Sequence, residues 1–138
     1  MVTVFGQLRW SAILLATVAY YVLGAIWFTP VFGRFYDKAL GFERAKGHKW
    51  PPIYYIGPFI SSLFVTVAIS VLIYALDVDA LSDVVLLGLI VGVGCAASIS
   101  FNNAINPKTP IPLLYGAVTG GYHVIGILVV AAVIFALK

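Results

Sequence analysis

Four long apolar stretches dominate the pattern of the chain, and short polar segments separate them. Each stretch is predicted to form a helix, over about residues 8–29, 53–76, 84–105 and 113–137. A helix needs roughly 20 apolar residues to cross a hydrocarbon core about 30 Å thick, at about 1.5 Å of rise per residue. The pattern therefore predicts an all-α, integral membrane bundle of four transmembrane helices, with residues 1–138 forming a single transmembrane domain.

The segment that follows the first stretch is amphipathic. Over residues 31–40 apolar side chains recur at helical spacing, whereas Arg34, Asp37 and Lys38 fall on the opposite side. This pattern is typical of a short helix that lies in the membrane interface. We expect Gly41 to end this helix, because glycine tolerates the left-handed conformation at a helix C-terminus.

Tryptophans lie at the ends of the predicted spans, where aromatic rings favour the membrane–water interface. Trp10 and Trp27 flank the first span, Trp50 precedes the second, and Pro30 is expected to end or bend the first. We expect Trp27, Trp50 and the basic residues of the same connection to contact lipid headgroups. These basic residues are Arg34, Lys38, Lys46 and Lys49.

Composition supports the membrane interpretation. Of the 138 residues, 62% are apolar and only 9% are charged, which is far from the balance of a soluble domain. The net charge of +3 comes mainly from one connection, so it indicates headgroup contact and orientation, and we expect no nucleic-acid partner. Cys95 is the only cysteine, which excludes an internal disulfide and a multi-cysteine metal site.

Basic residues gather on one side of the predicted bundle. The connection at 30–52 holds five Lys and Arg residues and that at 106–112 holds one, whereas the other side has only Arg9 and Lys138. The positive-inside rule then places both connections in the cytoplasm and both termini outside, with the protein in the cytoplasmic (inner) membrane. This imbalance also argues against a protein that inserts in both orientations.

Glycines recur at a spacing of four residues in the third and fourth spans. Gly88 and Gly92 form such a pair, with Ala96 one turn further along, and Gly116 and Gly120 repeat the spacing. Faces of small residues let a neighbouring helix approach closely. We therefore expect these faces to pack helices together and to support a homo-oligomer.

His123 is the candidate functional residue inside the spans, which otherwise hold no Asp, Glu, Lys or Arg apart from their margins. It lies roughly 16 Å from the cytoplasmic end of the fourth span. Hydroxyl and thiol groups of the other spans are expected at the same depth, in one polar layer: Tyr20, Tyr21, Ser61, Ser62, Cys95 and Ser98. The imidazole either contacts a proton or polar solute in a cavity, or holds helices together through a hydroxyl.

A second polar cluster, Asn102, Asn103 and Asn106, ends the third span. Amide side chains offer both hydrogen-bond donors and acceptors. They either line a mouth for polar solutes or ions, or cap the helix and meet headgroups. Asn102 and Asn103 are accordingly further candidates for solute contact.

The segment LGAIWFTPVFGRFYDKALGF, residues 23–42, resembles the hallmark of small bacterial membrane proteins grouped as domain of unknown function 1761. The family pattern, Gly-x-x-Trp-aromatic-x-Pro-x-Phe-Gly, closes the first helix, and the matching residues are Gly24, Trp27, Phe28, Pro30, Phe32 and Gly33. The step Gly121-Tyr122-His123 is similar to part of the family's last helix. The resemblance implies a four-helix integral membrane protein and supplies no activity.

The sequence contains no catalytic or cofactor motif, since it lacks HExxH, a phosphate-binding loop and a dinucleotide fingerprint, and its acidic residues lie outside the spans. We therefore expect no enzymatic activity, no cofactor and no metal. Three functions remain open. The first is a small homo-oligomeric transporter or channel-like protein for a small solute or ion. The others are a non-catalytic structural or accessory membrane protein, and a protein that binds lipid, with the bilayer and anionic lipids as partners.

Overall fold

A computed structural model describes residues 2–138, and these residues form helices and connections without a strand. Four helices are long and apolar enough to cross a membrane: Trp10–Val31, Ile53–Ala75, Leu81–Ala104 and Pro112–Ala136. Their ends lie within three residues of the predicted ones. The predicted all-α class with four spans is therefore confirmed, and the chain is a multi-pass membrane protein.

Two of the spans combine α-helical and wider, π-helical segments. The first consists of α1 (Trp10–Ile26) and η2 (Trp27–Val31), and a short helix, α2 (Gly33–Leu40), follows it. The second is α3 (Ile53–Ala75). The third contains α4 (Leu81–Leu89), η3 (Ile90–Ala97) and α5 (Ser98–Ala104), and the fourth is α6 (Pro112–Ala136). A 3-10 turn, η1 (Val2–Gly6), precedes the first span.

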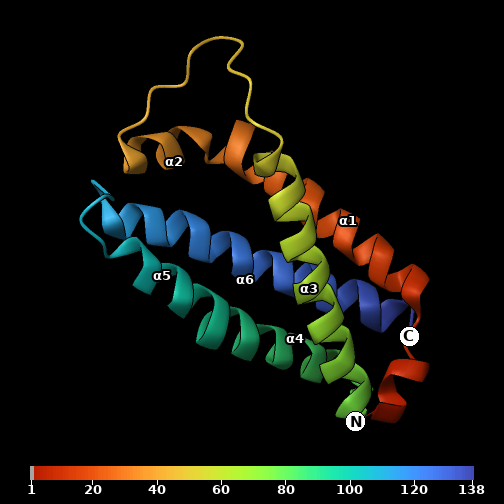
Figure 1. Ribbon diagram of the computed structural model, residues 1–138. Coiled ribbons are helices and arrows are strands. Elements are labelled where there is room, and N and C mark those ends of the chain that lie inside the picture. The colour runs from red at the N-terminus through yellow and green to blue at the C-terminus, as the bar shows by residue number, and fades with distance from the viewer. Residues whose placement is uncertain (1) are drawn as a thin grey trace.

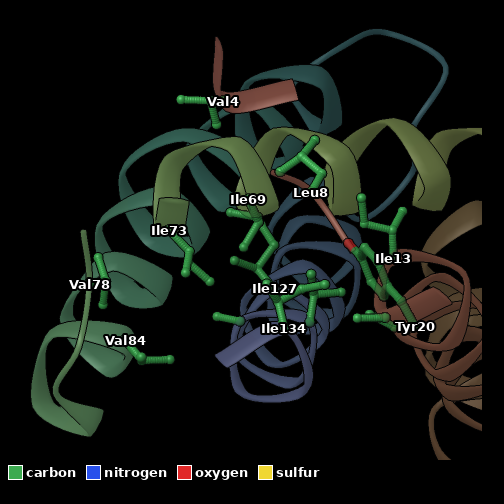
Figure 2. Packing of buried hydrophobic residues seen from close by; sticks show 14 of the residues in the cluster. Val4, Leu8, Ile13, Tyr20, Ile69, Ile73, Val78, Val84, Ile127 and Ile134 are labelled. Atoms are coloured by element: carbon green, nitrogen blue, oxygen red, sulfur yellow. The ribbon is translucent and has the colours of Figure 1, made fainter. Parts of the chain in front are cut away.

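α6 is the central helix, and the other spans pack around it (Figure 1). Half of its most apolar window is buried inside the chain, compared with 28% or less for the other spans. Figure 2 shows Ile127 and Ile134 of α6 meeting Ile69 and Ile73 of α3 and Ile13 of α1. The other spans turn large apolar side chains outward, as a lipid-facing surface requires; examples are Leu14, Phe64, Leu86 and Ile99.

The first span ends in a π-helical turn that contains Pro30. Proline lacks a backbone N–H, and its ring clashes with the carbonyl four residues earlier in an α-helix. The Phe32 amide donates instead to the Trp27 carbonyl, five residues earlier, at 2.7 Å. The expected end or bend is therefore a π-helical turn, which leads from the first span to α2.

Two glycines set the ends of α2. A Cβ atom at Gly33 would lie 2.8 Å from the Phe28 carbonyl oxygen, so the tight approach requires a residue without a side chain. Gly41 adopts a φ of +63°, and its amide donates to the Lys38 carbonyl at 3.2 Å, which ends the helix as expected. The Ala39 carbonyl accepts from the Ile111 amide at 3.1 Å and so ties α2 to the start of α6.

The third span packs on α6 through small residues, but its register is not uniform. The contacts with α6 that involve glycines are spaced by four, five and four residues along the third span: Gly88, Gly92, Ala97 and Phe101. The step of five falls in η3, where a π-helical turn accommodates an extra residue. Ala96 packs against the buried hydrophobic cluster, as expected, and Ala97 is the residue that lies next to Gly120.

The glycines of α6 meet this face from the other side. A Cβ atom at Gly120 would lie 3.3 Å from the Ala97 Cβ, and one at Gly116 would press on the Phe101 ring. The glycine faces of the two spans thus cover one another within one chain. Contrary to expectation, they are not free to join two copies.

The two termini and the connection before α4 meet at the end of the bundle opposite α2 (Figure 1). The Arg9 guanidinium donates to the Leu137 carbonyl at 2.7 Å, close to the negative end of the α6 dipole. Lys138 pairs with Asp79 at 2.8 Å and with Asp77 at 3.5 Å. The hydrogen bond to Asp79 raises the pKa of Lys138 above its ordinary value.

Candidate functional site

Tyr20 of α1 and His123 of α6 form a hydrogen bond of 2.6 Å between the phenol oxygen and Nδ1 of the imidazole. Both residues lie near the middle of their spans. A phenol that donates to Nδ1 leaves the neutral imidazole with its proton on Nε2, whereas a protonated imidazole donates from Nδ1 to the phenol oxygen. The pair is thus able to gain or lose one proton and keep its hydrogen bond.

Tyr122 completes an aromatic cluster around this pair. Its ring centroid lies 5.1 Å from that of Tyr20 and 4.9 Å from that of His123. Two glycines leave room for these rings: a Cβ atom at Gly126 would overlap the Tyr20 ring, and one at Gly24 would lie 2.9 Å from the Tyr122 hydroxyl oxygen. Gly24 of the family pattern is therefore explained by the close approach of Tyr122.

A small cavity of about 80 Å³ adjoins the pair. It lies between α1, α3 and α6, and its lining residues are Tyr20, Pro58, Ser61, Ser62, Tyr122 and His123. Polar groups line it on all three helices, and Ser62 is only 3% exposed. Apolar atoms form most of its accessible wall, and a cavity of this size has room for a few water molecules or for a small solute next to the hydroxyl and imidazole groups.

A larger cavity of about 260 Å³ lies next to the small one, beneath α2 and the connection at 41–52. Aromatic side chains form most of its wall: Tyr21, Phe28, Tyr36, Trp50, Tyr54 and Tyr55. Pro58 and Tyr122 line both cavities. The two cavities therefore share a wall, and together they extend from the α2 end of the bundle to His123.

Arg44 is the charged residue of the larger cavity. Its Nη2 donates to the Asp37 carboxylate at 2.8 Å, and its guanidinium lies 5.5 Å from the centre of the Trp50 ring. Its Nε is buried and finds no acceptor among residues 2–138. Burial, followed by the neighbouring Tyr115, raises the pKa of Tyr36 to about 12, so this phenol remains neutral beside Arg44 at neutral pH.

The structure brings together only part of the expected polar layer. Tyr20, Ser61, Ser62 and His123 surround the small cavity, and Tyr21 lines the larger one. Cys95 and Ser98 instead lie on the exposed face of the third span, because the extra residue in η3 rotates them away from α6. The Ser98 hydroxyl donates to the Val93 carbonyl of its own helix at 2.9 Å.

The other candidates lie farther from the cavities. Asn102 and Asn103 are exposed at the end of α5. The expected headgroup contacts Arg34, Lys38, Lys46 and Lys49 are exposed near the larger cavity, and Trp50 lines it. Within residues 2–138, no three His, Cys, Asp or Glu side chains lie close enough to hold a metal ion.

Trp27 has a role that the sequence did not predict. Its Nε1 donates to the Val118 carbonyl of α6 at 3.0 Å, and its ring packs where Gly121 leaves space. Trp27 therefore packs the end of the first span against the central helix α6 and forms a hydrogen bond with it. Trp27 and Gly121 of the family pattern thus contact each other across two helices.

Sequence reasoning missed the larger cavity and the place of Tyr122 between the two cavities. The sequence pattern includes Arg44 only among the five basic residues of the connection at 30–52 and assigns no role to Tyr54 or Tyr55. The available signal was the density of aromatic residues in 20–36 and 50–55, two segments that face each other in the folded chain.

A family model described as "Protein of unknown function (DUF1761)" matches residues 11–135 and confirms the resemblance noted in the sequence. No curated protein and no solved structure matches the chain. The matched residues run from the first span to the end of α6 and include every residue that lines the two cavities. The chain therefore belongs to the DUF1761 family of proteins of unknown function.

Proposed function

We propose that this protein is a small, non-enzymatic transporter or channel-like protein that moves a proton or small polar solute past the Tyr20–His123 pair. The observation that carries the proposal is the shared wall of the two cavities, which Pro58 and Tyr122 form. A movement of the Tyr122 ring would join the cavities and give a solute a route from the α2 end of the bundle to His123. The reversible hydrogen bond of the pair suits a proton relay.

The orientation that we propose places the mouth of the larger cavity in the cytoplasm. The connections at 30–52 and 106–112 hold six basic residues and would face inward in the cytoplasmic membrane, with both termini outside. Arg9 and Lys138 at the other end contact the Leu137 carbonyl and Asp79. These two are the only Lys or Arg residues on that side, and the imbalance of six against two supports the orientation.

We also propose that the protein self-associates through the third span. Gly94, Cys95, Ser98 and Asn102 are exposed along one side of this span, and a Cβ atom at Gly94 would contact nothing. Small and polar residues on a lipid-exposed face favour contact with another helix. A second copy would cover these residues.

A proton or solute flux assay in proteoliposomes tests the proposed function. His123→Gln keeps a polar side chain but removes the titratable imidazole, and we expect it to abolish the flux. The matched control is Ser100→Ala, since the Ser100 hydroxyl bonds only to the Ala96 carbonyl of its own helix in this structure, at 2.8 Å. Unchanged flux in folded His123→Gln, for protons and across a broad solute panel, would contradict the proposal.

A structural or accessory role is the second candidate function. The observation that favours it is the burial of Tyr20, which is 1% exposed and joins α1 to α6 through His123. On this view the pair stabilises the bundle, and a partner protein provides the activity. A stable partner in a mild-detergent pull-down would support this role, whereas a clean homo-oligomer in native mass spectrometry would weaken it.

Anionic lipid is a further partner that we propose at α2. Arg34 and Lys38 are exposed on this helix, and Lys46 and Lys49 are exposed on the connection that follows. Basic groups at this level attract the anionic headgroups of the cytoplasmic leaflet. Arg34→Gln with Lys38→Gln should lower the retention of anionic lipid in the purified protein, and unchanged retention would argue against this contact.

A further inference from the structure

We propose that the larger cavity is a binding site for a small organic anion, namely a carboxylate or similar anionic group on a compact apolar body, preferably an aromatic ring. This inference deepens the proposed function because it names the class of solute. Its role in transport rests on that function, whereas the binding itself does not. The two are therefore tested separately.

The walls of the cavity suit the apolar body of such a ligand. Seven aromatic rings line a volume of about 260 Å³, which is just below the usual range for drug-sized ligands of about 300–1,000 Å³. The fit favours a single ring with a short substituent. Aromatic walls bind a ring through stacked and edge-to-face contacts, and the phenols of Tyr21, Tyr54 and Tyr55 supply hydrogen-bond donors for its anionic group.

Arg44 supplies the charge that selects an anion. Asp37 accepts a hydrogen bond from Nη2 and so restrains one side of the planar guanidinium. Nε has no acceptor within the described chain, although buried N–H donors are nearly always satisfied. A ligand carboxylate that enters the cavity, with a small rotation of the side chain, would provide this missing acceptor.

An aromatic cavity also suits an organic cation, which would bind against the ring faces. Two observations disfavour a cation here. The Arg44 guanidinium already lies over the Trp50 ring at 5.5 Å. In addition, the connection at 30–52 carries five basic and two acidic residues, so its net positive charge attracts anions to the mouth of the cavity and repels cations.

The binding test uses the full-length protein in nanodiscs of neutral phosphatidylcholine and follows quenching of the tryptophan fluorescence, because Trp50 lines the cavity. The probes are benzoate, its neutral analogue benzamide and the cation benzylammonium. We expect saturable quenching by benzoate, with binding about tenfold weaker for benzamide and absent for benzylammonium. Equal binding of the three probes, or no saturable binding of benzoate, would overturn the proposal.

Two variants test whether the anion binds at Arg44. Arg44→Gln should weaken benzoate binding about tenfold and leave benzamide unchanged. Lys108→Gln removes the same charge from an exposed position in the other connection on this side and should bind benzoate normally. If Arg44→Gln fails to fold, the double variant Asp37→Asn/Arg44→Gln removes the half-buried ion pair without leaving a charge unpaired. Normal benzoate binding by either folded Arg44 variant would overturn the proposal.

The same chemistry exists in anionic lipid headgroups, and the composition of the nanodisc distinguishes the two sources. Addition of phosphatidylglycerol should leave benzoate binding unchanged if the site takes a soluble anion. If lipid is the natural source, phosphatidylglycerol should compete with benzoate in the wild type. If the wild type transports benzoate and Arg44→Gln does not, the site takes part in transport. If the wild type binds benzoate but transports neither benzoate nor protons nor any other solute tested, the binding site stands and only the proposed function is refuted.

Discussion

Gly126 of α6 faces the ring of Tyr20 so closely that a Cβ atom there would overlap it. His123, which accepts or donates the hydrogen bond of the same tyrosine, lies three residues earlier on the same helix. The absence of a side chain at Gly126 thus lets the Tyr20 ring pack directly against α6, and His123 forms a hydrogen bond with its hydroxyl. This relationship joins the packing of the bundle to the chemistry of the candidate site.

Gly126→Ala should destabilise the protein by about 1–3 kcal/mol, because the added methyl group forces the buried Tyr20 ring out of place. The measurement is thermal or chemical unfolding in mild detergent. Gly57→Ala is the matched control, since a Cβ atom there makes only an ordinary contact of 3.9 Å with Ile53. Equal stability of the two variants would show that Tyr20 does not pack against Gly126.

The Tyr20–His123 hydrogen bond should contribute only modestly to stability. Buried hydrogen bonds between membrane helices average about 0.6 kcal/mol and reach about 1.7 kcal/mol. A double-mutant cycle with Tyr20→Phe and His123→Leu, each of which removes the hydrogen bond, measures this coupling energy by unfolding. We expect a value within that range, together with a complete loss of flux in His123→Gln. A larger coupling with unchanged flux would favour the structural role.

Cys95 offers a direct test of self-association. It is the only cysteine, and it is exposed beside Gly94 on the third span. Mild oxidation of native membranes should therefore cross-link two copies into a disulfide-bonded dimer on a non-reducing gel. Gly94→Leu, which adds bulk to the same face, should reduce the cross-linked fraction several-fold. This interface would be ruled out if the protein remained monomeric under oxidation. It would also be ruled out if Gly94→Leu left the cross-linked fraction unchanged.

The phenol of Tyr36 should ionise at a higher pH than that of an exposed tyrosine. Burial and the nearby Tyr115 raise its pKa from 10.0 to about 12, so the folded chain holds this proton more tightly than the unfolded chain does. Its contribution to stability is therefore complete below pH 10 and is lost as the pH rises through about 12. The phenolate absorbance of wild type minus that of Tyr36→Phe reports this group. A difference component with a midpoint near pH 10 would contradict the burial of Tyr36.

The spans could be predicted from the sequence because the length of each apolar stretch is a local property, and this length decides whether a helix can cross the bilayer. The depth of His123 was predictable for the same reason, since a regular rise per residue brings Tyr20 to the same level. The direction in which Ser98 points was not predictable, because one extra residue in η3 rotates everything beyond it. A helical period assumed to be constant cannot reveal such a turn.

The larger cavity was beyond the sequence for a different reason. Tyr36, Arg44 and Tyr54 come from three segments, and they meet only because the connection at 41–52 folds back over the ends of α1 and α3. No pattern within one segment indicates such a meeting. The family pattern around Gly24 and Trp27 marked the region, but their contacts with Tyr122 and Val118 of α6 appear only in the fold.

The hydration of the route between the two cavities tests the account most directly. Ser62 is buried yet lines the small cavity, whereas Phe64 is 71% exposed on the outer face of α3. In a Cys95→Ser background, Ser62→Cys should react with a membrane-impermeant thiol reagent applied from the side of the 30–52 connection, and Phe64→Cys should not. An unreactive Ser62→Cys, or equal reactivity of both positions, would contradict an aqueous route to His123.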